Sequence, residues 1–293
     1  MDWSALDYSM APHGYRELRT NQACVELPGM VYFVLAGRDH REWLQGQATN
    51  DVRQLEHMPW LDFCLTKPSG QLTAVCRAWK SGADTIIATQ QPLVLEERAK
   101  DTVFIEDVSL SRAKEDYVCV QGIEAKRVEG SLFSDRTGSG GVERVPGAHH
   151  LPDAISRDAY LLATLEAGIP LFGTDTGDKT LPPELGPHFE SNHVSYTKGC
   201  YTGQEVLMRM HSRGHTNKTW VGLRANAPIS PGARVSYEGK DVGTVHRAAL
   251  SPAFGHIASA TLRNEATTEG TRVQAGDTAA EVVTMPFLRQ TLP

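Results

Sequence analysis

A change of sequence pattern near Gly214 constrains the fold more than any other feature. After this residue the chain has only short runs of β-forming residues, and turns that contain glycine separate them. Short strands at this spacing are typical of a small barrel or sandwich. We therefore expect residues 216–293 to form a β-barrel, with strands near residues 220–223, 234–237, 242–245, 256–262, 272–273 and 281–284.

Before Gly214, strand and helix patterns are mixed. The run at residues 30–36 is continuous, apolar and stops at Gly37, which fits a strand buried on both faces. A helix is expected to follow, because Asp39 and Glu42 have the spacing of a capping box. Residues 49–51 offer a second helix cap.

Alternation of apolar and polar residues from 61 to 89 predicts an antiparallel meander. Its strands lie near residues 61–66, 71–80 and 85–89. A helix near residues 93–100 and strands near residues 104–110 and 117–121 are expected after it. Helices that pack on an antiparallel sheet define the α+β class.

The next part of the chain combines irregular segments with one helix. Residues 136–147 are rich in glycine and contain a proline, which predicts a loop or a boundary. A helix near residues 155–167 follows, and Gly168 is placed to cap its C-terminus. Residues 172–187 have no periodicity, and irregular segments of this length are more often functional than decorative.

Composition limits the cellular setting and the partners. The chain has 293 residues, a length typical of about two domains. Its 29 basic and 35 acidic residues give a formal charge of −6, so we expect no direct binding of nucleic acid. There is no apolar run of about 20 residues and no leader-like N-terminus, which predicts a soluble cytoplasmic protein without a membrane partner.

The five cysteines are odd in number, form no CxxC pair and indicate free thiols in a reducing compartment. Four of them, Cys24, Cys64, Cys76 and Cys119, lie in strand-like runs and are expected in the core. The fifth, Cys200, lies in a different setting.

The most informative segment is the motif Lys198-Gly199-Cys200-Tyr201-Thr202-Gly203-Gln204-Glu205. Apolar residues recur at helical spacing after Gly203, so Cys200 is predicted at or just outside a helix N-terminus. Unpaired backbone N–H groups at such an end favour a thiolate, and the charge of Lys198 acts in the same direction. Cys200 is therefore the cysteine with a physical reason to be reactive.

Other interpretations of this segment stay open. A lone cysteine is most often a small buried apolar residue. His211 and His215 have the spacing of metal ligands, but Gly214 interrupts the helix between them, and we expect no metal site. A cysteine hydrolase needs a partner histidine that the sequence does not identify, and a permanent iron–sulfur cluster normally needs four thiolates.

The motif resembles the Lys-Gly-Cys-aromatic-x-Gly-Gln-Glu signature of the YgfZ family. These are folate-binding proteins of iron–sulfur cluster maturation, related to the aminomethyltransferase T-protein of glycine cleavage. Residues 37–52 resemble the N-terminal segment of the family, and residues 165–170 with 181–184 resemble its central segment. The resemblance covers most of the chain up to about Leu223 and is weaker in the barrel.

The resemblance implies a fold of two α+β domains of the T-protein type plus a C-terminal β-barrel. These surround a central opening for tetrahydrofolate or a one-carbon derivative. Residues 1–215 would then form the folate-binding region. One of its subdomains would contain residues 1–45 with 122–215, and the other residues 46–121.

The resemblance also implies the site residues. Glu166 matches the glutamate that hydrogen-bonds the pterin in the T-protein, and a carboxylate suits this role because it accepts two N–H bonds. Without the family, Glu166 is as readily a solvated helix residue. Asn50 and Asp51 either face the same opening or cap a helix. Arg209 and Arg213 either meet the folate carboxylates or lie on a solvated face.

The remaining site residues come from the motif itself. By resemblance, Cys200 and Lys198 are the functional pair, and the folate-binding residues include Tyr201, Gly203, Gln204 and Glu205.

Two departures from the T-protein pattern bear on catalysis. Thr164 stands where an arginine commonly precedes the Leu-Glu-Ala-Gly run, so the ion pair of that arginine is missing. The catalytic aspartate of the T-protein has no counterpart, because residues 87–95 contain no carboxylate before Glu96. Aminomethyl transfer is therefore doubtful.

The sequence thus predicts an accessory protein that binds a reduced folate and supports iron–sulfur cluster assembly or repair. Its partners would be iron–sulfur client proteins or assembly factors, contacted transiently, and its effect on tRNA modification would be indirect. The alternative is a folate-dependent aminomethyl- or methyltransferase that uses Glu96 or Glu97 as its acid. A third possibility is a relative that has kept the fold and lost the ligand.

Overall fold

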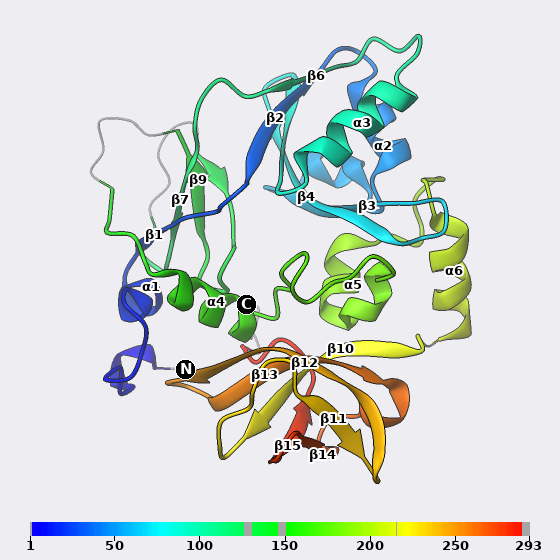
Figure 1. Cartoon of the computed structure of the whole chain (residues 1–293). Coiled ribbons are helices and arrows are strands. Elements are labelled where there is room, and N and C mark those ends of the chain that lie inside the picture. Colours follow the sequence, from blue (N-terminus) through cyan, green and yellow to red (C-terminus); the bar gives the residue numbers. More distant parts are fainter. Residues whose placement is uncertain (1, 126–130, 146–150, 215, 289–293) are drawn as a thin grey trace.

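The computed structural model describes residues 2–125, 131–145, 151–214 and 216–288 (Figure 1). Within these residues the strands form a five-stranded sheet, a four-stranded sheet and a closed barrel. Helices accompany the two open sheets, whereas the barrel contains strands and one short 3-10 helix. The predicted α+β class with a C-terminal barrel is confirmed.

The five-stranded sheet is antiparallel and contains the predicted meander. Its strands, in spatial order, are β3(Leu61–Thr66), β4(Leu72–Ser81), β5(Asp84–Thr89), β2(Val31–Ala36) and β6(Ser109–Arg112). One face packs on the helices α2(His40–Gln47), η2(Val52–Glu56) and α3(Pro92–Thr102). Phe33 and Leu35 of β2 point into this core, and Tyr32 points to the other face. The run that begins near residue 30 is therefore buried on both faces, as predicted.

Two local predictions in this sheet are wrong. The strand expected at residues 104–110 begins only at Ser109, because the carboxylate of Glu106 accepts the backbone N–H groups of Phe104 and Ile105 in a turn. Asp39 does not cap α2 with its side chain. Its carboxylate instead accepts the backbone N–H of Asp107 over 2.8 Å. This hydrogen bond joins the start of α2 to the segment that leads into β6.

The four-stranded sheet has the order β1(Ala23–Val25), β7(Val118–Gln121), β9(Gly141–Arg144) and β8(Leu132–Phe133). It lies beside the helices α1(Tyr15–Thr20) and α4(Arg157–Glu166) (Figure 1). The core here includes Tyr15 and Leu18 of α1, Leu162 of α4 and Phe189. The short helix η1(Trp3–Ala5) precedes α1, and Trp3 packs against the same core.

Residues 136–147 are not all loop, which corrects the sequence prediction. β9 lies inside this segment because Val142 and Glu143 pair with β7 on one side and β8 on the other. Gly138 and Gly140 have positive φ values and form the turn before β9. The glycines thus mark a turn and not a boundary. Residues 146 and 147 lie outside the described residues.

The boundary between the two predicted subdomains also needs correction. The sequence predicts residues 31–45 in one subdomain with residues 122–215, but β2 and α2 belong to the five-stranded sheet. The reason is that β2 pairs with β5 and β6, which follow it by many residues. The five-stranded sheet with its helices therefore spans roughly residues 31–112.

The C-terminal barrel closes in the order β10-β13-β12-β11-β14-β15. Its strands are β10(Lys218–Ala225), β11(Arg234–Tyr237), β12(Lys240–Ser251), β13(Gly255–Arg263), β14(Arg272–Ala275) and β15(Thr278–Val283), with η4(Asn264–Ala266) after β13. The predicted strands are all present, and several are longer than expected. Leu223, Val235 and Leu262 are among the residues that fill the interior.

Between β9 and the barrel, the chain forms the helices α4, η3, α5 and α6. Ser156 caps α4 with its hydroxyl, and Gly168 ends it with a φ of +65°, as predicted. The irregular segment 172–187 leads into η3(Pro182–Leu185) and α5(Pro187–His193). α6(Gln204–Arg213) follows. No helix in the described ranges is long and apolar enough to cross a membrane.

Candidate functional site

Gly203 fixes where α6 begins. This glycine is the N-cap residue with a φ of +84°, and a Cβ atom here would lie 2.5 Å from the carbonyl oxygen of Lys67. Thr66 Oγ1 donates to the carbonyl oxygen of Thr202 over 2.5 Å. The start of α6 is therefore docked on the turn between β3 and β4. The predicted helix start immediately after Gly203 is confirmed.

Cys200 lies three positions before this N-cap and is exposed. Cys64, Cys76 and Cys119 are buried, as predicted, while Cys24 is half-buried. Burial raises the pKa of each of these four thiols. Among the described residues, Cys200 is thus the thiol that a partner molecule reaches directly.

The ammonium of Lys198 is directed at the end of α2, and the functional pairing of Cys200 with Lys198 stays a prediction. Its ammonium is buried and donates to the carbonyl oxygens of Gln45, Ala48 and Asn50 over 2.5, 2.5 and 3.2 Å. These carbonyls lie at and just after the C-terminal end of α2, where the helix dipole favours a cation. Burial lowers the pKa of Lys198 to about 8, against the opposing effect of the Asp51 charge.

Tyr201 is buried on the other side of Cys200. Its ring centroid lies 5.0 Å from Lys198 Nζ, and it packs with Val194 and Leu207. Its hydroxyl group is buried without a hydrogen-bond partner among the described residues. We refer to residues 198–203 as the thiol loop: an exposed cysteine between a buried lysine and a buried tyrosine.

Asn50 and Asp51 have their polar atoms occupied within the chain. Asn50 Nδ2 donates to the carbonyl oxygens of Asp62 and Asn192, and its Oδ1 accepts from the Asp51 backbone. The Asp51 carboxylate caps η2 by accepting the backbone N–H of Arg53. The capping alternative therefore describes Asp51, and Asn50 joins α5 to β3.

The remaining motif residues lie along α6. Glu205 is 85% exposed on its side chain and pairs with Arg209 over 2.8 Å. Gln204 is half-buried and Arg213 is exposed. Their contact with a folate stays a prediction.

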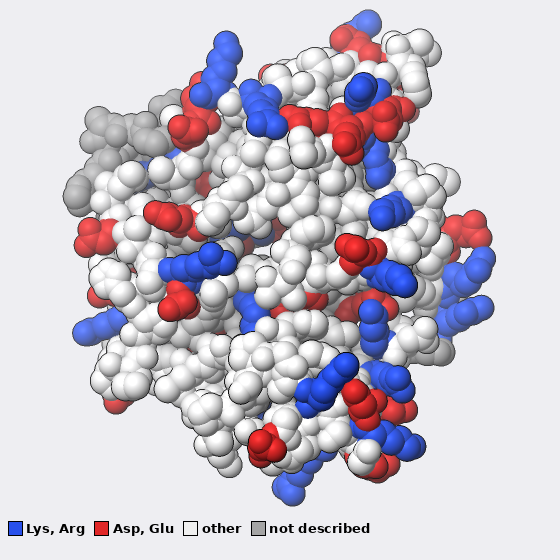
Figure 2. Space-filling model, viewed as in Figure 1, with Lys and Arg blue, Asp and Glu red and all other residues white. Residues whose placement is uncertain are grey.

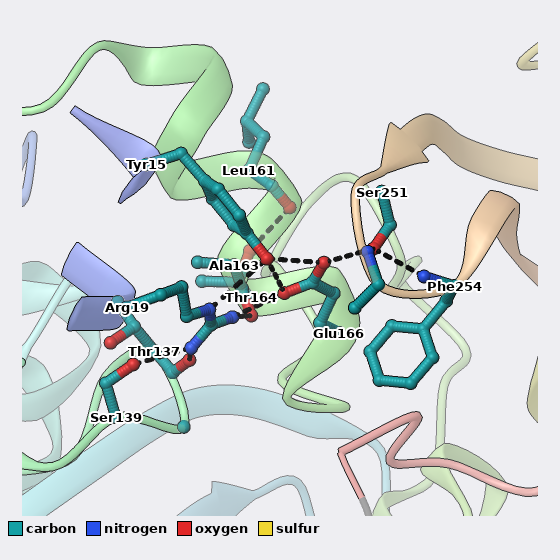
Figure 3. A network of polar contacts seen from close by, with 12 residues as sticks. Tyr15, Arg19, Thr137, Ser139, Leu161, Ala163, Thr164, Glu166, Ser251 and Phe254 are labelled. Carbon is teal, nitrogen blue, oxygen red and sulfur yellow. Dashed lines mark hydrogen bonds and ion pairs between the residues drawn. The ribbon is translucent and has the colours of Figure 1, made fainter. Parts of the chain in front are cut away.

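Glu166 is neither a solvated residue nor an open ligand group. It is 0% exposed, and its carboxylate accepts hydrogen bonds from the Tyr15 hydroxyl, from Arg19 and from Ser251 (Figure 3). The Arg19 contact is an ion pair of 2.5 Å between two buried side chains. We call these four residues the carboxylate hub. It joins α1, α4 and the end of β12.

Arg19 has further partners that hold it in place. Its guanidinium donates to the Thr137 carbonyl and the Ser139 hydroxyl over 2.8 and 2.6 Å, and it lies 4.9 Å from the Trp3 ring centroid. The hub thus extends to the turn before β9 and to the N-terminal segment.

An arginine also approaches Thr164, although from another part of the chain. Arg247 of β12 donates to the Thr164 hydroxyl and to the carbonyl oxygens of Leu161 and Ile169. Its Nε lies 2.8 Å from the Asp175 carboxylate. The buried carboxylates of Glu166 and Asp175 are therefore paired with arginines from α1 and from the barrel.

The structure brings Asn50 into contact with Lys198 of the thiol loop and places Glu166 in the separate carboxylate hub. Glu166 ends α4, whereas the thiol loop precedes α6, and α5 lies between these helices in Figure 1. Sequence reasoning missed Tyr15, Arg19 and Ser251 of the hub. The spacing of Tyr15 and Arg19 on one helix face was visible, but nothing local connects it to Glu166.

The residues named for the metal site and for the transferase alternative lie in separate places. Within the described ranges no group of three or more His, Cys, Asp or Glu side chains is arranged to hold a metal ion. His211 stacks on Tyr196, and His215 lies outside the described residues. Glu96, an acid of the transferase alternative, pairs with Arg112 over 2.8 Å at the surface of α3, and Glu97 is exposed.

Comparisons with known proteins agree with this fold. No protein-family model matches the chain. The chain is 23% identical to the tRNA-modifying protein YgfZ of Yersinia enterocolitica over 248 residues, which cover 71% of this chain and 72% of that protein. It is also 23% identical to the tRNA-modifying protein YgfZ of Yersinia pseudotuberculosis over 250 residues, with 71% and 73% covered.

Among solved structures, the chain is similar to the glycine cleavage system aminomethyltransferase T from Bartonella henselae. The TM-score is 0.76 at 16% sequence identity, and the match covers 94% of this chain and 89% of that chain. The predicted resemblance and the predicted T-protein type of fold are both confirmed.

Proposed function

We propose that this YgfZ-like protein, built on the aminomethyltransferase fold, is an accessory protein for the assembly or repair of iron–sulfur clusters. It presents Cys200 to client proteins or assembly factors, and it binds tetrahydrofolate or a one-carbon derivative. The observation that carries the proposal is the thiol loop, in which an exposed thiol lies between two buried anchors.

The chemistry of an exposed thiol suits a transient role. A thiolate is the usual protein ligand of iron in these clusters, and four thiolates normally hold a cluster permanently. The other cysteines are buried or half-buried on strands, so Cys200 acts without thiol neighbours on the surface. A single accessible thiol is suited to contact a cluster on another protein and then to release it.

The carboxylate hub bears on where a folate would bind. The Glu166 carboxylate has the acceptor chemistry that a pterin edge requires. However, both of its oxygens are occupied and the residue is fully buried, so a pterin does not fit at Glu166 while these contacts persist. The proposed binding of folate is supported by the family resemblance.

The surface charge favours protein partners over nucleic acid. On the face shown in Figure 2, basic and acidic side chains are interspersed. The formal charge of −6 does not favour a polyanion. We propose that an effect on tRNA modification is indirect and passes through iron–sulfur enzymes that modify tRNA.

The test is complementation of a strain that lacks this gene. Wild type should restore the activities of iron–sulfur enzymes, and Cys200→Ser, expressed at the same level, should not. Cys24→Ser is the matched control, because it removes a half-buried thiol on β1 and should complement fully. If deletion leaves iron–sulfur enzymes unaffected, the proposal fails.

Folate binding is tested separately by thermal unfolding. Tetrahydrofolate at about 100 times its Kd stabilises a folded protein by roughly 2.7 kcal/mol. A melting temperature that rises with tetrahydrofolate concentration is expected. If no reduced folate shifts the melting temperature, the chain has kept the fold without the ligand.

A further inference from the structure

The structure assigns Lys198 a positioning role: its buried ammonium anchors the thiol loop and thereby fixes the place of Cys200. The biological purpose of this anchor rests on the proposed function of Cys200. The anchor itself follows from contacts that are independent of that function.

The hydrogen-bond donors of Lys198 match the acceptors around them in number. An ammonium has three N–H donors and no acceptor. Three backbone carbonyl oxygens, those of Gln45, Ala48 and Asn50, converge on Nζ. Because Lys198 is only 5% exposed, water does not compete for these donors. All three donors are therefore directed at the α2 terminus, and none is left for the thiol.

Hydrogen bonds also join the two chain segments that meet at Lys198, residues 49–50 and residues 192–195. Thr49 Oγ1 donates to the carbonyl oxygen of His193 over 2.6 Å, and the Ser195 backbone N–H donates to the carbonyl oxygen of Thr49 over 2.9 Å. Asn50 Nδ2 donates to the carbonyl oxygen of Asn192 over 2.8 Å. Lys198 is the last contact of this series before the chain reaches Cys200.

The chain is also held on the C-terminal side of Cys200, at residues 201–203. Tyr201 is 7% exposed within an apolar cluster, the Thr202 carbonyl accepts from Thr66, and Gly203 lies against the Lys67 carbonyl. The thiol loop is thus fastened on both sides, and Cys200 lies exposed between the fastenings. A short side chain on a backbone held at both ends has little freedom to move.

The competing explanation is that Lys198 activates the thiol by its charge. The two explanations predict different effects for a substitution of Lys198 that keeps its positive charge. Lys198→Arg keeps the positive charge, but a planar guanidinium does not place three donors on three converging carbonyls. Lys198→Met keeps an unbranched side chain, one atom shorter than lysine, and removes the three donors. Thr66→Val loosens the other side of the loop without changing any charge.

The experiment measures two properties of each purified variant. Hydrogen exchange of the peptide that covers residues 196–203 reports how firmly the loop is held. The pH at which alkylation of Cys200 is half-maximal, followed by mass spectrometry of its peptide, reports the electrostatic effect on the thiol. We expect exchange at least about tenfold faster than wild type in all three variants, which corresponds to about 1.4 kcal/mol. We expect no change in the alkylation midpoint.

Two results would overturn the inference. One is unchanged exchange of the loop in both Lys198→Arg and Lys198→Met. The other is an alkylation midpoint that rises in Lys198→Met but stays at the wild-type value in Lys198→Arg and Thr66→Val, because that pattern shows charge activation. Both readouts are independent of iron–sulfur enzymes, so a failed complementation test leaves this result interpretable.

Discussion

Glu166 illustrates how burial changes the role of a charged residue. A buried carboxylate is tolerated only when opposite charge and hydrogen-bond donors surround it. Arg19, Tyr15 and Ser251 supply both. Such a pair adds little net stability over an apolar replacement of both partners, but removing one partner leaves an uncompensated charge.

The carboxylate hub therefore predicts a large effect of a small change. Glu166→Gln should lower the free energy of unfolding by about 3–5 kcal/mol, because it leaves the buried Arg19 guanidinium without its counter-charge. Tyr15→Phe should cost about 1–3 kcal/mol, since it removes one donor and keeps the charges paired. Urea denaturation of the two variants and of the wild type would measure both differences.

Glu17→Gln provides the control on α1, the helix of Tyr15 and Arg19, because Glu17 is exposed. It should change the free energy of unfolding by no more than about 0.5 kcal/mol. An equal, small effect of Glu166→Gln and Glu17→Gln would contradict the buried ion pair.

At the scale of elements, the position of α6 depends on Gly203. Gly203→Ala should lower the free energy of unfolding by at least about 2 kcal/mol, because the left-handed backbone and the contact with the Lys67 carbonyl both exclude a Cβ atom. Gly199→Ala is the control in the same motif, since a Cβ atom at Gly199 meets nothing within 4 Å. If both variants unfold at the same denaturant concentration, α6 does not depend on this close approach.

Elements with a strong local signal were predictable from the sequence. The buried strand β2, the meander β3–β5 and α4 with its Gly168 cap each carry a pattern within a few residues. β9 and the true start of β6 were not predictable from the sequence. β9 depends on its pairing with β7, and the start of β6 depends on the carboxylate of Glu106, which lies outside the strand.

The same division applies to the candidate site. The motif around Cys200 and the helix after it were predictable, because both depend on adjacent residues. The direction of the Lys198 side chain was not predictable, since its partners lie about 150 positions away in the sequence. The partners of Glu166 are equally remote: Tyr15 lies 151 positions before it, and no periodicity links residues at that separation.

Across the whole molecule, buried charges join the two open sheets. Arg77 of β4 pairs with Asp62 over 2.6 Å and donates to Ser134 and to the Asp135 carbonyl, which follow β8. Glu143 of β9 pairs with Arg136 over 2.7 Å. It also accepts from Tyr32 of β2.

This network predicts destabilisation by acid. Burial alone raises the pKa of the Asp62 and Glu143 carboxyls, but Arg77 and Arg136 outweigh it and hold both pKa values below their ordinary ones. Between the folded and the unfolded pKa, the unfolded chain binds more protons, so the stabilisation is complete above about pH 5 and is lost as the pH falls below about 4. The free energy of unfolding, measured from pH 7 to pH 3, should decline accordingly.

A variant separates this network from the general charge of the protein. Glu143→Gln should flatten the decline, because one of the two carboxyls no longer titrates. Glu97→Gln removes an exposed carboxylate and should leave the slope as in wild type. An identical slope in Glu143→Gln would show that the acid sensitivity arises elsewhere.

The carboxylate hub also sets an order of events during synthesis. Arg19 and Glu166 are separated by 147 positions, and Ser251 follows Glu166 by another 85. Ribosomes add roughly 5–20 residues per second, so Arg19 waits roughly 7–30 seconds for its counter-charge. Until then, burial of its guanidinium without a counter-charge is unfavourable. Docking of the N-terminal helix through this ion pair therefore follows the translation of Glu166, which lies in the second half of the chain.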